Sequence, residues 1–385
     1  MEYIVVGCGI SGSVIARELA DKGHSVKIYD RRNHIAGNLF DYKDEYGILI
    51  QKYGPHIFHT SDEEVYQYAI KYGDWQKYKL VCGAEWDGKY TPSPFNFETI
   101  DIFFDKIKAE KIKKVIQREY PNEQTIPVVE MMNHHNSLIR EYAQFLFEND
   151  YAPYTAKQWG MKAENVNPDV LKRVPVRLNY EIGYFCDKYE MMPQISFTEF
   201  VKNILNHPNI DIMLNEDAKK HITFSDDKIL WDNNLISGRV IYTGPIDELF
   251  DCVYGELPYR SLRFEWRHSK KDSMQQAPVV AYPKAKDYTR ITEFKKLPIQ
   301  NVKGTTYAIE YPLTYKEGSK MEPYYPVSTD KSEEKVKLYK ILASKIDNLV
   351  LCGRLADFKY YNMDQAIKKA LTIAYLLGGE NEYED

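Results

Sequence analysis

Three glycines near the start of the chain, Gly7, Gly9 and Gly12, have the spacing G-x-G-x-x-G that is typical of a site for a dinucleotide pyrophosphate. In such a site the first glycine permits a tight turn, the second lets backbone approach the phosphates, and the third lets a helix pack on a strand. The phosphates then meet the N-terminus of that helix, whose unpaired N–H groups bind anions. Ser11 lies in the same turn, and Asp30 stands about where an acid accepts a hydrogen bond from a ribose hydroxyl. These residues predict that the chain binds an adenine dinucleotide.

The segments around the glycines predict the elements that position them. Residues 3–6 are apolar with β-branched character, residues 13–22 have a helical pattern, and residues 25–29 form a second strand pattern that ends on Asp30. A bare glycine motif is weak evidence, because glycine-rich turns are common. Here strand, turn, helix, strand and acid follow one another in the order of a dinucleotide-binding unit.

The residues after Asp30 distinguish between cofactors. Arg31 and Arg32 lead into Asn33-His-Ile-Ala-Gly-Asn38, a polar segment that ends in a small turn. This segment resembles the extended signature of flavoproteins of the glutathione reductase and amine oxidase kind, in which basic residues and a second glycine turn lie along FAD. NAD stays open, and Arg31 would also suit a 2′-phosphate. The segment favours FAD.

The composition indicates a soluble globular protein. A chain of 385 residues exceeds what one core usually serves, so we expect two or three domains, which can be discontinuous in sequence. No apolar run reaches the roughly 18 to 20 residues that span a bilayer, so no membrane insertion is expected, nor is a secretory signal. The net charge of -5 gives no electrostatic case for binding nucleic acid.

Cysteine, histidine and tyrosine limit the remaining chemistry. The five cysteines form no C-x-x-C pair, which predicts neither disulfides nor a zinc site and fits a cytoplasmic protein best. His56 and His59 are three residues apart, but a Gly-Pro turn precedes them and no third ligand cluster accompanies them, so we predict no metal. Core packing is the simpler interpretation of His56, whereas contact with a ligand explains His59 as well as packing does. The 32 tyrosines exceed what core packing explains and suit stacking or phosphate binding.

The middle of the chain predicts an inserted helical subdomain. Residues 62–73 predict a short helix and residues 80–90 a hairpin, after which residues 96–150 become helical and charged. We expect the lysine-rich residues 106–114 to form a solvated face. One apolar face is expected to comprise Ile102, Phe103, Ile107, Ile112 and Ile116.

Two segments that follow combine aromatic residues with cations. Residues 151–160 are rich in aromatic and polar groups without clean periodicity, which predicts a loop or a broken helix. Residues 171–177 carry three cations around a proline and cannot form a continuous helix. Arginines on a loop beside aromatic residues suit a diphosphate, because guanidinium pairs bidentately with phosphate oxygens.

Together these motifs resemble those of the bacterial UDP-galactopyranose mutase family, in matching order over nearly the whole chain. The blocks Tyr53-Gly-Pro-His-Ile-Phe-His-Thr60 and Lys157-Gln-Trp-Gly160 carry the specificity, because the glycine motifs alone would indicate only a flavoprotein. The further matching blocks are residues 7–12, 33–38, 172–177, 242–247, 288–293, 310–312, 323–326, 353–354 and 363–364.

The resemblance implies an α/β fold, with a discontinuous Rossmann-like FAD-binding domain, an inserted helical domain and an antiparallel β-sheet domain. Strand patterns at residues 210–242 and 261–311, a buried strand at 348–354 and a helix at 363–377 capped by Asn362 agree with it. The expected FAD-binding parts are residues 1–78, 196–247 and 323–385. The expected helical domain is residues 96–150, and the expected sheet and substrate domain comprises residues 79–95, 151–195 and 248–322.

The activity implied by the resemblance is interconversion of UDP-galactopyranose and UDP-galactofuranose, which feeds galactofuranose into cell-surface polysaccharide. Reduced FAD is the implied cofactor, with its N5 as the nucleophile on the anomeric carbon. The protein then need only hold the flavin, position the sugar and stabilise the leaving diphosphate. A homodimer is also expected.

The resemblance assigns roles residue by residue. Arg173, Arg290 and His59 are the expected catalytic residues, and Tyr151 stands where a phenylalanine often stacks on uracil. The expected cofactor-binding residues are Gly7, Gly9, Ser11, Gly12, Asp30, Arg31, Asn38, His56, Arg354 and Met363. The expected substrate-binding residues are Tyr151, Tyr154, Thr155, Trp159, Arg173, Tyr184, Arg290, Tyr325 and Tyr360.

Two residues depart from the family pattern. Ala36 replaces the first glycine of the usual Gly-Gly-Asn turn, which we do not expect to abolish FAD binding, and Asn362 stands where the family often has aspartate. Three alternatives stay open: a variant mutase that also accepts UDP-N-acetylgalactosamine, an amine-oxidase-like FAD dehydrogenase, and an NAD-binding regulatory module without turnover.

Overall fold

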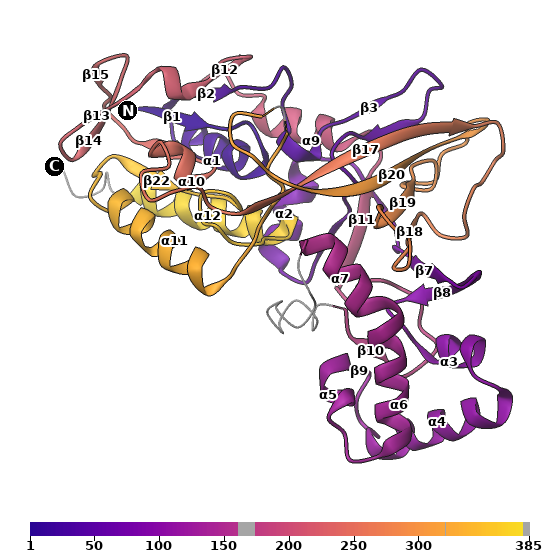
Figure 1. Ribbon diagram of the computed structural model, residues 1–385. Helices are drawn as coiled ribbons and strands as arrows, with labels where there is room; N and C mark the ends of the chain where they lie inside the picture. The colour runs from indigo at the N-terminus through magenta and orange to yellow at the C-terminus, as the bar shows by residue number, and fades with distance from the viewer. Residues whose placement is uncertain (161–173, 320, 380–385) are drawn as a thin grey trace.

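The computed structural model of the protein describes residues 1–160, 174–319 and 321–379 (Figure 1). One layer is a parallel sheet in the order β12-β2-β1-β16-β22, which brings together segments from the start, the middle and the end of the chain. The expected discontinuous α/β fold is therefore confirmed, although the last strand is shorter than expected and only half-buried. The strands are β1 (Glu2–Val6), β2 (Ser25–Asp30), β12 (Ile210–Leu214), β16 (Val240–Tyr242) and β22 (Leu349–Leu351).

Helix α1 (Ile10–Asp21) begins inside the glycine motif, three residues before the expected start at residue 13. Gly9 occupies the N-cap position, so Gly12 lies in the first helical turn. A Cβ at Gly12 would come within 2.1 Å of the carbonyl oxygen of Gly7. The third glycine therefore belongs to the helix, which is why a pattern of larger side chains places the start of the helix too late.

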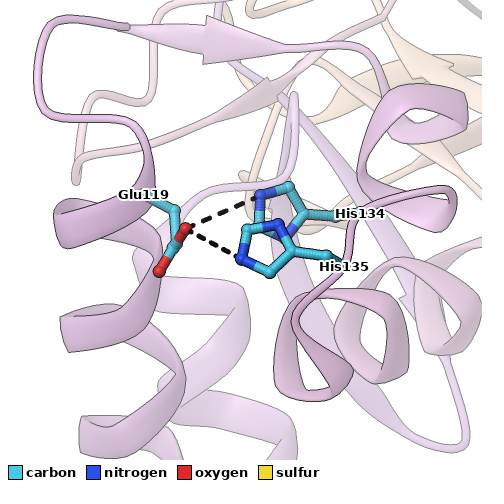
Figure 2. Close-up of side chains that lie close together, drawn as sticks. All are labelled: Glu119, His134 and His135. Carbon is cyan, nitrogen blue, oxygen red and sulfur yellow. Dashed lines mark ion pairs between the residues drawn. The ribbon is translucent and has the colours of Figure 1, made fainter.

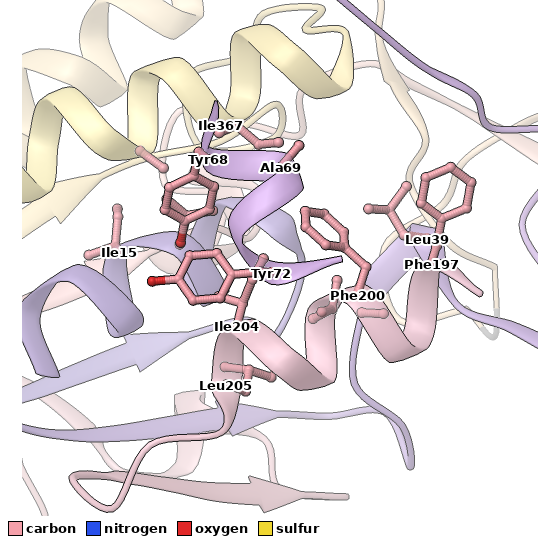
Figure 3. Close-up of a cluster of buried hydrophobic side chains, with 14 of the residues drawn as sticks. Ile15, Leu39, Tyr68, Ala69, Tyr72, Phe197, Phe200, Ile204, Leu205 and Ile367 are labelled. Carbon is pink, nitrogen blue, oxygen red and sulfur yellow. The ribbon is translucent and has the colours of Figure 1, made fainter. Parts of the chain in front are cut away.

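Helix α2 (Glu63–Tyr72) lies between α9 (Phe197–Leu205) and α12 (Met363–Gly379), as Figure 3 shows. Tyr68 and Tyr72 of α2 pack with apolar residues of both neighbours in the main buried core. Helix α12 also packs along α1, so the C-terminal helix covers the first βαβ unit. The short helix α10 (Ile246–Leu249) and α11 (Asp330–Ala343) pack together in a second core.

A larger sheet has the order β21-β17-β20-β19-β18-β7-β8. Its pairs are antiparallel, as expected, except that β18 pairs with β7 in parallel. The expected hairpin at residues 80–90 forms its edge. The strands are β7 (Cys82–Trp86), β8 (Lys89–Ser93), β17 (Tyr259–Ser269), β18 (Val279–Ala281), β19 (Arg290–Glu293), β20 (Thr305–Thr314) and β21 (Tyr325–Pro326).

Four helices form a lobe at the foot of Figure 1, around a core of their own. The single apolar face expected at residues 102–116 is wrong at Ile107, which is 71% exposed. The first helix ends before Phe104. Asp105 caps a new helix, because its side chain accepts hydrogen bonds from two backbone N–H groups at 3.0 Å. The helices are α3 (Phe97–Phe103), α4 (Lys106–Glu119), α5 (Val128–Met132) and α6 (Ser137–Leu146).

The lysine-rich face of α4 is not uniformly solvated, contrary to expectation. Lys113 is buried, and its ammonium lies 2.8 Å from Asp101 and 2.6 Å from Glu110. It also donates to the Tyr180 hydroxyl at 2.9 Å. One lysine of this face therefore connects α4 to α3 and to the segment that follows the lobe.

Helix α7 (Ala152–Trp159) continues α6 through a π-helical turn, Phe147–Tyr151. The expected loop at residues 151–160 is therefore wrong, and the alternative of a broken helix is the better description. Pro153 lies in the first turn of α7, where a missing N–H is tolerated. The helix ends at Gly160, whose φ of +64° suits glycine.

Smaller elements complete the fold. One three-stranded sheet joins β5 (Phe58–Thr60), β11 (Tyr189–Pro193) and β6 (Trp75–Lys77), and another joins β13 (Ile222–Ser225), β14 (Lys228–Trp231) and β15 (Asn234–Leu235). Two-stranded ribbons join β3 (Asp41–Lys43) to β4 (Leu49–Gln51), and β9 (Thr125–Ile126) to β10 (Val176–Arg177). Single 3₁₀ turns occur at Gly37–Leu39 and Ala218–Lys220. Over the described ranges, no helix combines the length and apolar character that crossing a membrane requires.

Candidate active site

A cavity of about 280 Å³, here called the dinucleotide cavity, opens where β1, β2 and β16 end. Its wall also includes the N-termini of α1 and α12. Ligands of open α/β sheets bind at the carboxyl ends of strands, so this is the expected position for a cofactor. The structure brings all ten expected cofactor-binding residues to this wall: Gly7, Gly9, Ser11, Gly12, Asp30, Arg31, Asn38, His56, Arg354 and Met363.

The backbone around the dinucleotide cavity leaves space that side chains would fill. Gly7 has a φ of +106°, and a Cβ there would come within 2.1 Å of Thr243 Oγ1. A Cβ on Gly37 would come within 2.8 Å of the Cα of Gly9. Beside these glycines, the first N–H groups of α1 lack partners within the helix. Bare backbone next to a helix N-terminus suits a pyrophosphate, so these residues fit a dinucleotide.

Asp30 is held by two backbone N–H groups. Its Oδ2 accepts from Cys8 at 2.8 Å, and its Oδ1 accepts from Arg32 at 2.9 Å. These bonds fix the orientation of the carboxylate, and each oxygen keeps a lone pair for a further donor. Asp30 can therefore accept a hydrogen bond from a ribose hydroxyl, as its position after β2 predicts.

The charges of Arg31 and Arg32 are balanced by carboxylates. Arg32 donates to Glu322 Oε2 at 2.7 Å, and Arg31 lies 3.5 Å from both Glu322 and Glu248. A 2′-phosphate at Arg31 would compete with these carboxylates. The arrangement therefore favours a dinucleotide without a 2′-phosphate. Of the cofactors that the sequence leaves open, FAD and NAD fit this condition.

A second group of side chains, here called the arginine–tyrosine cluster, comprises Arg290, Glu310, Tyr154, Tyr325 and Tyr360. Arg290 Nε donates to Glu310 Oε2 at 2.8 Å, and Glu310 is 1% exposed. Burial opposes the charge of Arg290, but Glu310 together with the facing Tyr154 and Tyr325 raises the pKa of its guanidinium above the ordinary value. The bond to Glu310 uses Nε and none of the N–H groups on the two terminal nitrogens.

Arg354 joins the arginine–tyrosine cluster to the dinucleotide cavity. The rings of Tyr325 and Tyr360 stack with centroids 5.9 Å apart, and the Arg354 guanidinium lies 4.7 Å from the Tyr360 centroid. Arg354 also donates to the carbonyl oxygen of Tyr361 at 2.6 Å. Since Arg354 lines the cavity, the two groups of residues share a wall.

His56 is the second residue that joins them. Burial, reinforced by the positive charges of Arg354 and Arg290, lowers the pKa of His56 to about 4. Its Nδ1 lies 2.9 Å from the carbonyl oxygen of Gly54, so the neutral ring donates there and keeps a lone pair on Nε2. His56 is thus a neutral group between the dinucleotide cavity and Arg290.

The resemblance implies a catalytic role for His59, which stays a prediction. Its Nδ1 is 2.8 Å from Asp187 Oδ2, and its ring stacks on Phe185 with centroids 3.6 Å apart. His59 is not among the residues that line the dinucleotide cavity. The hydrogen bond and the stacking fix the orientation of the His59 ring beside the segment that carries Tyr184 and Phe185.

The remaining expected substrate residues fall into two groups. Tyr151 is buried in the core of the helical lobe, where its hydroxyl donates to the Val174 carbonyl oxygen at 2.6 Å, and Thr155 is also buried. The stacking of Tyr151 on uracil stays a prediction. Arg173 and the side chain of Trp159 lie outside the described residues.

In the described part of the chain, Glu119, His134 and His135 are the possible metal ligands that lie close together (Figure 2). The Nε2 atoms of His135 and His134 lie 3.3 Å and 4.0 Å from Glu119 Oε2. The backbone N–H of Asn136 donates to His134 Nδ1 at 3.1 Å, which leaves the proton of the neutral ring on Nε2. Binding a metal at that nitrogen would require the proton to move to Nδ1, against the Asn136 N–H. We interpret the group as hydrogen-bonded.

The fold and the dinucleotide cavity define a Rossmann-type dinucleotide-binding protein. A family model described as an NAD(P)-binding Rossmann-like domain matches residues 5–71, and one described as UDP-galactopyranose mutase matches residues 149–360. The chain belongs to the UDP-galactopyranose mutase family and is an isomerase.

Individual relatives agree with this assignment. The chain is 33% identical over 380 residues to the UDP-galactopyranose mutase of Mycoplasma pneumoniae, covering 97% of this chain and 95% of the relative. It is 34% identical over 384 residues to a dTDP-fucopyranose mutase of Escherichia coli, covering 97% and 98%. A crystal structure of a reduced UDP-galactopyranose mutase superposes with a TM-score of 0.72 at 14% identity, covering 100% of this chain and 95% of that structure, and supports the fold.

Several residues at the site were not foreseen from the sequence. They are Glu248, Glu310 and Glu322, which pair with arginines, Asp187, which pairs with His59, and Lys157 and Arg260, which hold helix α7. Each contacts a segment distant in sequence. The motif Glu310-Tyr-Pro312 was a signal for Glu310, whereas no local pattern indicated the other pairings.

Proposed function

We propose that this isomerase interconverts UDP-galactopyranose and UDP-galactofuranose and uses FAD in its reduced form. The observation that carries the proposal is the wall that the dinucleotide cavity shares with the arginine–tyrosine cluster, through His56 and Arg354. A cofactor in the cavity and a diphosphate at Arg290 would meet at this wall. The names of the Mycoplasma relative and of the superposed structure support the choice of substrate.

The cofactor would be held by the residues that line the dinucleotide cavity. The glycine turn and the N-terminus of α1 would bind the pyrophosphate, and Asp30 would bind a ribose hydroxyl. The N-terminus of α12 borders the same cavity, and its dipole favours negative charge there. When bound, the reduced flavin supplies the nucleophile for the anomeric carbon of the sugar.

The protein side of the reaction is binding and charge stabilisation. Arg290 would bind the diphosphate through its terminal nitrogens, because Glu310 holds its Nε. Hydroxyls of Tyr154, Tyr325 and Tyr360 would donate to phosphate oxygens, so that the leaving UDP stays bound for its return. The resemblance assigns a second diphosphate contact to Arg173.

A different nucleotide sugar is a second candidate substrate. The dTDP-fucopyranose mutase of Escherichia coli is as similar to this chain as the UDP-galactopyranose mutase of Mycoplasma pneumoniae is, at 34% and 33% identity. Overall similarity therefore does not select between a uridine and a thymidine nucleotide. UDP-N-acetylgalactosamine stays a third candidate, as expected from the family.

The test is a comparison of substrates on the reduced enzyme. UDP-galactofuranose, dTDP-fucofuranose and UDP-N-acetylgalactosamine are incubated separately, and the isomers are separated by chromatography. We expect conversion of UDP-galactofuranose, and Arg290→Ala should abolish most of it while weakening UDP binding. Arg267→Ala, an exposed arginine of the same sheet, is the matched control and should leave both unchanged. Preferential conversion of the dTDP sugar would overturn the proposed substrate.

A homodimer and a cytoplasmic location stay predictions. Light scattering on the purified holoenzyme at several concentrations measures the oligomeric state. We expect a mass twice that of the 45.1 kDa chain.

A further inference from the structure

Lys157 of helix α7 reaches across to the connection between β18 and β19, residues 282–289. Its Nζ donates to the carbonyl oxygens of Tyr282 at 2.6 Å, Ala285 at 2.7 Å and Tyr288 at 2.9 Å. A protonated lysine has three N–H donors, so each has an acceptor. All three acceptors lie in one connection, and Arg290 is the residue directly after it.

The Lys157 ammonium is held there against a desolvation cost. Burial lowers the pKa of Lys157 to about 8, although the negative charges of Asp150 and Asp287 act in the opposite direction. A lysine that served only the solubility of α7 would leave its ammonium in water. The three carbonyls compensate part of that cost, which indicates that the contact has a purpose beyond solvation.

The connection has few hydrogen bonds of its own. The Tyr282 N–H donates to the carbonyl oxygen of Thr289 at 2.8 Å, and the Ala285 N–H donates to the carbonyl oxygen of Tyr282 at 3.1 Å. At its far end, Thr289 donates its N–H to the Glu310 carbonyl oxygen at 2.9 Å, beside the Arg290–Glu310 pair. Displacement of the connection would therefore move the backbone that carries Arg290.

Helix α7 is itself fixed to the same sheet from its C-terminal end. Arg260 of β17 donates through Nε to the Gln158 carbonyl oxygen at 2.9 Å and through Nη1 to Thr314 Oγ1 at 2.9 Å. Arg260 is 6% exposed. With α7 fixed in this way, the Lys157 side chain links the helix that carries Tyr154 to the connection that precedes Arg290.

We propose that Lys157 is a positioning residue for diphosphate binding: its contact with the three carbonyls holds the connection 282–289 so that Arg290 and Tyr154 face the same ligand. This inference rests on the proposed function, because it takes Arg290 as the diphosphate arginine. Lys157 does not itself need to touch the substrate.

The test compares three variants of the flavin-loaded enzyme by titration with UDP. Lys157→Met removes all donors, Lys157→Arg restores a cation with several donors, and Lys114→Met changes an exposed lysine of α4 as a control. We expect Lys157→Met to raise the UDP dissociation constant about tenfold or more, and Lys157→Arg to recover most of the loss. Lys114→Met should match the parent protein, and flavin content should be equal in all of them.

Hydrogen exchange at pH 7 supplies a readout independent of UDP. Amides in residues 282–289 should exchange faster in Lys157→Met than in the parent protein, with protection regained in Lys157→Arg. Unchanged exchange together with unchanged UDP affinity in Lys157→Met would overturn the inference. If Lys157→Met does not fold, Lys157→Gln, which keeps two donors, is compared with Lys157→Arg on the same two readouts.

Arg290→Ala separates the inference from the proposed function. If Arg290→Ala weakens UDP binding and Lys157→Met does not, the positioning role is wrong while the diphosphate site stands. If neither weakens it, the diphosphate site itself is wrong.

Discussion

At the scale of single residues, the site combines groups that the sequence motifs identify with one residue that the fold holds in strain. Ala36 has a φ of +72°, in the left-handed region that costs an L-residue roughly 1–2 kcal/mol. It lines the dinucleotide cavity and is fully buried. The family pattern has glycine there, so this chain tolerates a conformation that its own residue disfavours.

Ala36→Gly should therefore stabilise the protein. Relief of the left-handed strain is partly offset by the greater freedom of glycine in the unfolded chain, which leaves a gain of up to about 1 kcal/mol. The urea midpoint measures it, with Ala69→Gly in the middle of α2 as a control that should lose about 1 kcal/mol or more. A lower midpoint for Ala36→Gly would show that the alanine methyl group contributes packing that outweighs the strain.

His56 predicts a pH dependence of stability. Its pKa is about 4 in the folded protein against an ordinary 6.5, so between these pH values the unfolded chain binds a proton that the folded chain excludes. The free energy of unfolding should therefore fall as the pH is lowered from 6.5 towards 4, by about 1–2 kcal/mol at pH 5. Denaturant midpoints of the flavin-free protein at pH 7 and pH 5 measure this change. His56→Gln should reduce it, and an equal loss in both proteins would assign the effect to other groups.

At the scale of elements, the presence of helices and hairpins was largely predictable, whereas several helix boundaries and the contacts between distant elements were not. The helix predicted at residues 62–73 and the hairpin predicted at 80–90 both form, because both depend on neighbouring residues. The break before Asp105 and the π turn before α7 were missed, because apolar spacing does not reveal where a helix must bend to reach its core. Residue patterns could not show that a lysine of an otherwise solvated face is buried.

That lysine, Lys113, tests the packing of the helical lobe. Lys113→Met should destabilise the protein by about 1 kcal/mol, because it removes the cation shared by Asp101, Glu110 and the Tyr180 hydroxyl, although these partners stay exposed to water. Lys111→Met changes an exposed lysine of the same helix and should have an effect within about 0.5 kcal/mol. Thermal unfolding of the two variants supplies the comparison, and equal midpoints would contradict the role given to Lys113.

At the scale of the whole molecule, the lining of the dinucleotide cavity was predictable, and the arginine–tyrosine cluster only in part. All ten expected cofactor residues meet in one cavity, because a glycine motif acts through local backbone geometry. The arginine–tyrosine cluster depends on the pairing of Arg290 with Glu310, which only the folded chain brings together. The structure places His56 at the shared wall, and the ligand contact that the resemblance implies for His59 stays a prediction.

The central claim is that a reduced flavin in the dinucleotide cavity acts on a nucleotide sugar bound at Arg290. The most direct test is anaerobic incubation of one preparation with UDP-galactofuranose, half of it reduced with dithionite and half left oxidised, with UDP-galactopyranose followed by chromatography. We predict isomerisation in the reduced half and little in the oxidised half, with no net consumption of an electron acceptor. Equal conversion in both halves, or none in the reduced half despite bound flavin, would contradict the account.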